Sequence, residues 1–143
     1  MSKDGLHWET RFDYGWGQPH WHPEPPLFGF WNAKAKRHVM TVRPGWGDRR
    51  VCIQDTADFR VWSGPQPLLQ PDPLDGLVEF YGMPVFPYGE AYVGLLWVFH
   101  CQTSDPPAGY NRFVGGLDTH LTYGYDGQHF QRGFRQPFIG LEA

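Results

Sequence analysis

The stretch Gly124-Tyr125-Asp126-Gly127-Gln128-His129-Phe130 is the last of three similar sequences in this chain. Ser2-Lys3-Asp4-Gly5-Leu6-His7-Trp8 and Thr56-Ala57-Asp58-Phe59-Arg60-Val61-Trp62 share its pattern of a small residue, an Asp and an aromatic residue. The aromatic residues lie about 50 to 70 residues apart, a spacing typical of proteins built from repeated units. We therefore expect a stack of β-units whose boundaries these turns mark.

In each repeat the Asp carboxylate can accept hydrogen bonds from backbone N–H groups, as Asp does in turns, while the aromatic residue packs between sheets. Asp4, Asp58 and Asp126 are therefore interpreted as structural residues that hold hairpins, and not as catalysts.

Composition favours many short strands over long helices. Of the 143 residues, 18 are Gly and 14 are Pro, and aromatic residues make up 17%. Gly and Pro at this frequency interrupt helices, whereas the aromatic residues can build a core. The sequence predicts an all-β fold, and its length predicts one domain.

Strand-like segments fall into two successive groups. The first group is 27–31, 38–43, 49–54 and a strand that begins at 60, and the second is 83–87, 91–100, 117–123 and 129–134. Segment 91–100 is a long and mostly apolar strand, which predicts burial on both faces.

These groups predict two four-stranded antiparallel blades of propeller type within a single β domain, 1–143. Residues 1–17 are expected to end a preceding blade and residues 137–143 to form a trailing segment. The first blade is placed at 18–70 and the second at 71–136.

Charge and hydropathy exclude several classes of partner. The formal net charge is −3, and no basic run stands out, so we expect no nucleic-acid partner. No apolar run reaches the length of a membrane span, and the first residues lack the apolar region of a signal peptide. We therefore expect a cytoplasmic protein without a membrane partner. Cys52 and Cys101 are expected to be buried free thiols, with a disulfide between them as the alternative.

Several segments together resemble a known group of enzymes. They are Arg49-Arg50-Val51, Gln70-Pro71-Asp72-Pro73-Leu74-Asp75, Glu79-Phe80-Tyr81-Gly82-Met83-Pro84-Val85-Phe86, Leu121-Thr122-Tyr123-Gly124-Tyr125-Asp126-Gly127 and Phe134-Arg135-Gln136-Pro137-Phe138-Ile139. With the Asp turns, they resemble the five-bladed β-propeller glycoside hydrolases of families 32, 43, 62 and 68 and their uncharacterised relatives. The resemblance covers about two blades, most of residues 27–139.

The resemblance implies a partial five-bladed propeller in which carboxylates from different blades meet in a central funnel. It implies a glycoside-hydrolase-like carbohydrate-active module that needs no cofactor. The alternative is a non-catalytic carbohydrate-binding or assembly module derived from a propeller glycosidase. About two blades cannot close a ring, so either partner chains complete it or the chain is a piece of a longer one. Because open sheet edges attract other strands, we expect a homo-oligomer.

Glu79 and Asp13 are the predicted catalytic carboxylates, because each closely precedes the expected innermost strand of its blade. Glycoside hydrolysis needs two such groups close together. The alternatives are a hydrogen-bonded carboxylate at a strand entry for Glu79 and a cap on local backbone amides for Asp13.

Trp16, Trp46 and Tyr81, each beside a glycine, are predicted to stack on sugar rings, and Asp118 is a further candidate for substrate binding. Packing between blades, or a polar network for Asp118, is the alternative. The pair His20 and His22 could share one face of a strand, but spacing places no third ligand near them, so no metal site is predicted.

Overall fold

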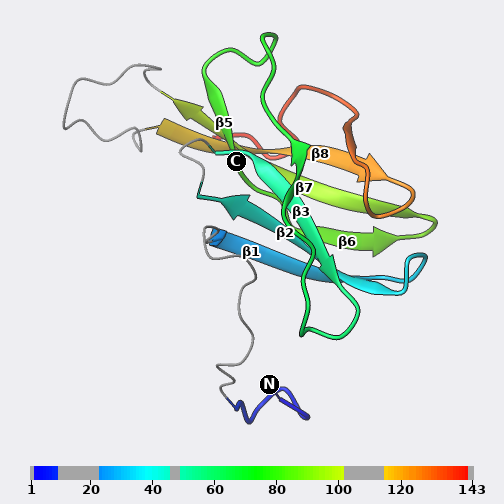
Figure 1. The fold of residues 1–143 in the computed structure, drawn as a ribbon. Coiled ribbons are helices and arrows are strands. Elements are labelled where there is room, and N and C mark those ends of the chain that lie inside the picture. Colours follow the sequence, from blue (N-terminus) through cyan, green and yellow to red (C-terminus); the bar gives the residue numbers. More distant parts are fainter. Residues whose placement is uncertain (1, 10–22, 46–48, 102–114, 142–143) are drawn as a thin grey trace, which may run out of the picture.

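The computed structural model describes residues 2–9, 23–45, 49–101 and 115–141. Within these residues the chain forms strands and turns and no helix, so none is present that could span a membrane. The strands form two antiparallel sheets that pack against each other (Figure 1). The all-β prediction is confirmed.

Sheet A is an up-and-down meander with strand order β1-β2-β3-β4. Its strands are β1 (Pro23–Asn32), β2 (Arg37–Pro44), β3 (Val51–Thr56) and β4 (Gln66–Leu69). The predicted fourth strand at residue 60 is wrong, because residues 57–61 form the bend of the Asp58 turn. β4 instead falls in the Pro-rich connection, where an edge strand tolerates Pro67.

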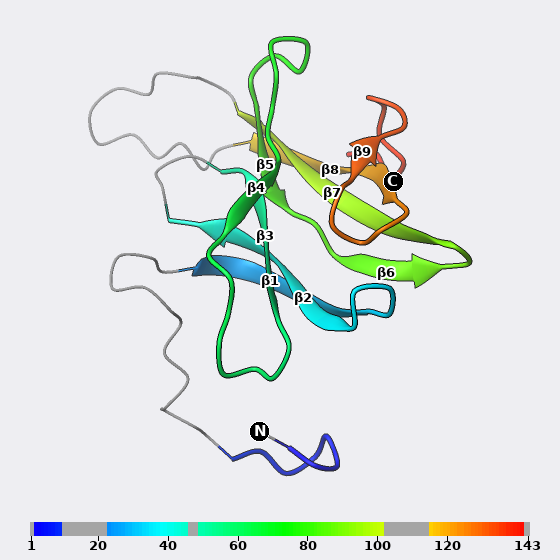
Figure 2. The same cartoon turned by 45° about the vertical axis from the view of Figure 1, so that its right-hand side comes forward.

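Sheet B follows the order β5-β7-β8-β9, with β6 also paired to β7 (Figure 2). Its strands are β5 (Val78–Gly82), β6 (Val85–Tyr88), β7 (Ala91–Cys101), β8 (Gly115–Gly124) and β9 (Gln131–Arg132). The sheet thus has five strands where four were predicted. β6 corresponds to the predicted strand at 83–87, whereas β5 was not predicted, and the two pair with successive parts of β7.

The burial of side chains alternates along β7. The prediction that both faces of this strand are equally buried is therefore wrong. Tyr92, Gly94, Leu96 and Val98 are buried, whereas the residues between them are half-buried. At Gly94 a side chain would collide with the Thr122 hydroxyl and the Met83 sulfur, so glycine allows these residues to fill the core.

The core lies between the two sheets. Sheet A contributes Phe30, Val39 and Val51, and sheet B contributes Phe80, Leu96 and other apolar side chains. Phe80 and Leu96 have no exposed surface. Removal of this apolar surface from water is the main force that holds the sheets together.

The three Asp turns have the hydrogen bonds that the repeated pattern predicts. In each, one carboxylate oxygen accepts the N–H groups two and three residues later. The residue after the Asp has a positive φ in every case, namely Gly5, Phe59 or Gly127. Burial raises the pKa of Asp126, but its bonds to His129 and to backbone amides outweigh this and lower the pKa to about 2.

The Asp126 turn also ties sheet B to sheet A. The backbone carbonyl of Asp126 accepts a hydrogen bond from the side-chain amide of Asn32, which is fully buried at the end of β1. The side-chain oxygen of Asn32 in turn accepts a hydrogen bond from the hydroxyl of Tyr92. A Cβ at Gly127 would lie 2.6 Å from the Asn32 nitrogen, so this contact requires glycine.

Candidate functional site

Three of the predicted site residues lie in the described part of sheet B. Glu79 and Tyr81 are in β5, and Asp118 is in β8. Glu79 lies within its strand and not before it, because β5 begins at Val78. Asp13, Trp16 and Trp46, and the histidines at 20 and 22, lie outside the described residues.

Glu79 and Tyr81 belong to a charged group at the junction of the two sheets. β1 and β5, each the first strand of its sheet, contact each other there. The N–H of Phe80 donates to the carbonyl of Arg49, which links β5 to the start of β3. We call Glu24, Arg43, Arg49, Glu79 and Tyr81 the junction cluster.

The buried ion pair between Arg49 and Glu79 is the centre of the junction cluster. An Arg49 Nη donates to a Glu79 carboxylate oxygen, and the two side chains are only 8% and 9% exposed. The Arg49 guanidinium also lies 5.3 Å from the centre of the Tyr81 ring and 5.1 Å from that of Phe99. The Glu79 carboxylate thus lies beside a positive charge and out of contact with most of the solvent.

A second Arg–Glu pair also contacts the ring of Tyr81. Arg43 donates to Glu24 at 2.9 Å, and its guanidinium lies 4.6 Å from the centre of the Tyr81 ring. Glu24 remains about half exposed, whereas Arg43 is nearly buried. Tyr81 thus connects a buried pair to a pair that water reaches.

Ionised carboxylates of this kind can stabilise a positive charge that develops on a ligand. In glycoside hydrolysis such a group stabilises the oxocarbenium-like transition state or attacks it, while a second, protonated carboxyl group donates to the leaving oxygen. Arg49 places a positive charge directly beside the Glu79 carboxylate.

Asp118 does not join the junction cluster. Cross-strand neighbours share a face of a sheet. Glu79 is opposite Phe99, and Phe99 is opposite Leu117. Asp118 is opposite Val98 and therefore lies on the other face. The two predicted carboxylates that the structure describes cannot form one catalytic pair.

Asp118 instead lies buried between two imidazoles. One carboxylate oxygen is 2.7 Å from Nε2 of His100, and the other is 3.0 Å from Nε2 of His120. The His100 ring is 43% exposed, whereas His120 and Asp118 are almost fully buried. This is the polar network that the sequence left as the alternative for Asp118.

Arg132 determines which ring nitrogen of a neutral His120 carries the proton. Its guanidinium can only donate, and it lies 3.1 Å from Nδ1 of His120. The proton of a neutral His120 is therefore on Nε2, the nitrogen that lies 3.0 Å from an Asp118 oxygen. The alignment of these two atoms does not make a hydrogen bond. Arg132 also pairs with the buried Asp75, which in turn bonds Arg135 at 3.0 Å.

Burial lowers the pKa of His120, and the charges of Arg132 and His100 act in the same direction against the opposite effect of Asp118. His120 is thus kept neutral at the centre of the network.

The described residues contain no group of three His, Cys, Asp or Glu side chains arranged to hold a metal ion. Asp118 has two histidines beside it, and Nε2 of His100 lies 2.7 Å from one of its oxygens.

Sheet A also carries an exposed aromatic side chain. Trp31 is 47% exposed and its ring centre lies 4.7 Å from that of His38. With Phe59 and Trp62 they line a pocket of about 330 Å³ on sheet A.

Sequence reasoning missed Glu24, Arg43 and Arg49. The sequence could have indicated Arg43, because it follows Val39 and Thr41 at every second position and so lies on the buried face of β2. A charged residue at such a position needs a partner. Arg49 offered no comparable signal, because its partner is 30 positions away in the chain.

The comparisons with known proteins found no matching family model, no matching curated protein and no matching solved structure. What the chain does must therefore be inferred from its own residues.

Replacing Glu79 by Gln is expected to lower the free energy of unfolding by about 3–5 kcal/mol, because it leaves the buried Arg49 without a counter-charge. Urea denaturation measures the change. Glu90→Gln, an exposed carboxylate in the turn after β6, is the matched control and should change stability by less than about 0.5 kcal/mol. Equal effects of the two substitutions would contradict the assignment.

Stability is also expected to fall when the pH is lowered below about 6.5. The pKa of His120 is lower in the folded state than the ordinary value of 6.5, so the unfolded chain binds more protons below that pH. His120→Gln should reduce this loss, whereas His7→Gln, at an exposed histidine, should not. Melting temperatures at several pH values measure it, and an identical pH dependence in wild type and His120→Gln would refute the prediction.

Proposed function

We propose that this chain is a glycoside-hydrolase-like carbohydrate-active module built from two propeller-type blades. Two successive antiparallel meanders support this, with an Asp turn after the third strand of sheet A and after β8 of sheet B. The matching place of the turns is what a repeated blade predicts.

The observation that carries the proposal is the junction cluster. The first strands of both sheets supply a carboxylate there, Glu24 from β1 and Glu79 from β5. Innermost strands that bring acidic side chains together are what the resemblance to propeller glycosidases implies for a central funnel.

In this proposal Glu79 acts as the carboxylate that attacks or stabilises the transition state. Asp13, predicted as its catalytic partner, remains a candidate for the second group. Trp16 and Trp46 remain candidates for stacking on the sugar. Two guanidinium groups already lie over the ring of Tyr81, so that ring could stack on a sugar only if one of them moved.

A non-catalytic carbohydrate-binding or assembly module is the second candidate. It is favoured by the pairing of both carboxylates in the junction cluster with arginines. Each glutamate of the cluster faces an arginine, and Asp118 lies on the other face of the sheet.

The hydrolytic proposal is tested by screening nitrophenyl glycosides with the wild type and Glu79→Gln. If Glu79 is catalytic, the substitution should lower kcat/KM by at least about a hundredfold. Glu90→Gln, assayed beside it at a temperature where both variants are folded, should retain full activity. Activity unchanged in Glu79→Gln would remove Glu79 from the mechanism, and no hydrolysis of any glycoside would leave the binding module as the function.

We further propose that copies of the chain associate. Sheet B ends in the two-residue strand β9, and the segment after it exposes Phe134, Phe138 and Leu141. Apolar residues beside an open edge favour contact with another chain. Light scattering at micromolar concentration should give a mass above that of one chain, and a purely monomeric mass would disprove the association.

A further inference from the structure

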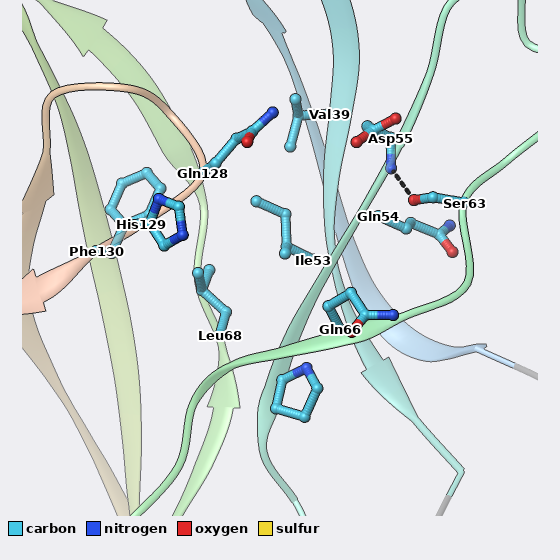
Figure 3. A pocket seen from close by; sticks show the side chains of 11 residues that line it. Val39, Ile53, Gln54, Asp55, Ser63, Gln66, Leu68, Gln128, His129 and Phe130 are labelled. Atoms are coloured by element: carbon cyan, nitrogen blue, oxygen red, sulfur yellow. Dashed lines mark hydrogen bonds between the residues drawn. The ribbon is translucent and has the colours of Figure 1, made fainter. Parts of the chain in front are cut away.

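A pocket of about 280 Å³ lies between the two sheets, away from the junction cluster. Sheet A supplies residues of β2, β3, β4 and the loop between β3 and β4, and sheet B supplies the turn between β8 and β9. Figure 3 shows Gln128 and His129 on one side of Ile53, with Asp55 and Ser63 on the other.

The pocket and the junction cluster share no residue. Val39 lines the pocket near the start of β2, whereas Arg43 lies near the end of that strand. Asp55 lies near the end of β3, whereas Arg49 precedes its start. The two sites are therefore at opposite ends of β2 and β3.

The floor of the pocket is apolar. Ile53 and Leu68 are half-buried there, and Phe130 is 9% exposed. These side chains belong to the core or pack against it, so the floor is held in place by the contact between the sheets. It can contact the C–H groups of a ligand.

The rim is polar but carries little net charge. The Asp55 carboxylate is paired with Arg37 at 2.5 Å, and its backbone N–H donates to the Ser63 hydroxyl at 2.8 Å. Gln66 and Gln128 add amide groups, each of which can donate and accept.

His129 completes the rim and is held by the Asp126 turn, because its Nδ1 lies 2.6 Å from the Asp126 carboxylate. The repeated turn thus positions a side chain of the pocket as well as a hairpin. This contact leaves Nε2 as the other polar atom of the ring.

We propose that this pocket binds a neutral sugar residue. Carboxylate, amide and hydroxyl groups around an apolar floor match a ring that has hydroxyls at its edge and C–H groups on its face. The pairing of Asp55 with Arg37 disfavours a charged ligand of either sign. The choice of a sugar rests on the proposed function, whereas the position of the site does not.

The test is an NMR titration of the ¹⁵N-labelled chain with methyl glycosides of neutral hexoses and pentoses. Each is added to about 20 mM, well above a millimolar dissociation constant. Sodium glucuronate is the charged comparison. A neutral glycoside should shift the backbone signals of Ser63 and Gln128, and glucuronate should bind more weakly.

Gln66→Ala should weaken the binding about three- to tenfold, as expected for one lost hydrogen bond. Gln136→Ala removes an exposed glutamine outside the pocket and should leave the affinity unchanged. Matching spectra of the free proteins confirm that both variants are folded.

Shifts confined to Glu79 and Tyr81 would overturn the pocket while supporting the junction cluster as the sugar site. Absence of shifts with every neutral glycoside, or stronger binding of glucuronate, would also overturn it. Binding at the pocket without hydrolysis in the glycoside screen would instead refute the hydrolytic role and leave the pocket standing.

Discussion

The ion pair between Arg49 and Glu79 joins the segment before β3 in sheet A to β5, the first strand of sheet B. Beside it, the Phe80 N–H donates to the Arg49 carbonyl, and the ring of Phe80 is completely buried. Burying one of these charges alone would be costly, so each side chain requires the other. Because the pair links one sheet to the other, it also restricts how the sheets can pack against each other.

That constraint limits the chemistry of the junction cluster. Two arginines contact the Tyr81 ring, and each neutralises one glutamate. Each glutamate of the cluster thus faces a guanidinium, which leaves the cluster close to neutral overall. On the opposite face of sheet B, Asp118 is held by two histidines and serves a separate network.

Much of the fold could be predicted from the sequence because its signals are local. The Asp turns depend on contacts within four residues, and the alternation of β2 and β8 depends on which face of one strand is buried. The errors arose where pairing outweighed local pattern. β4 follows the Asp58 turn later than predicted, and β5 was missed, although it pairs with the same strand β7 as the predicted strand that became β6.

The sequence by itself determined the all-β class, the turn role of Asp4, Asp58 and Asp126, and Glu79 and Tyr81 as residues of interest. Only the tertiary structure decided that Glu79 is paired with Arg49, that Asp118 lies on the other face, and that Gln66 and Gln128 meet at one pocket. The physical reason is distance along the chain. Hydrogen bonds within a turn follow from neighbouring residues, whereas the partner of a buried charge depends on how two sheets pack.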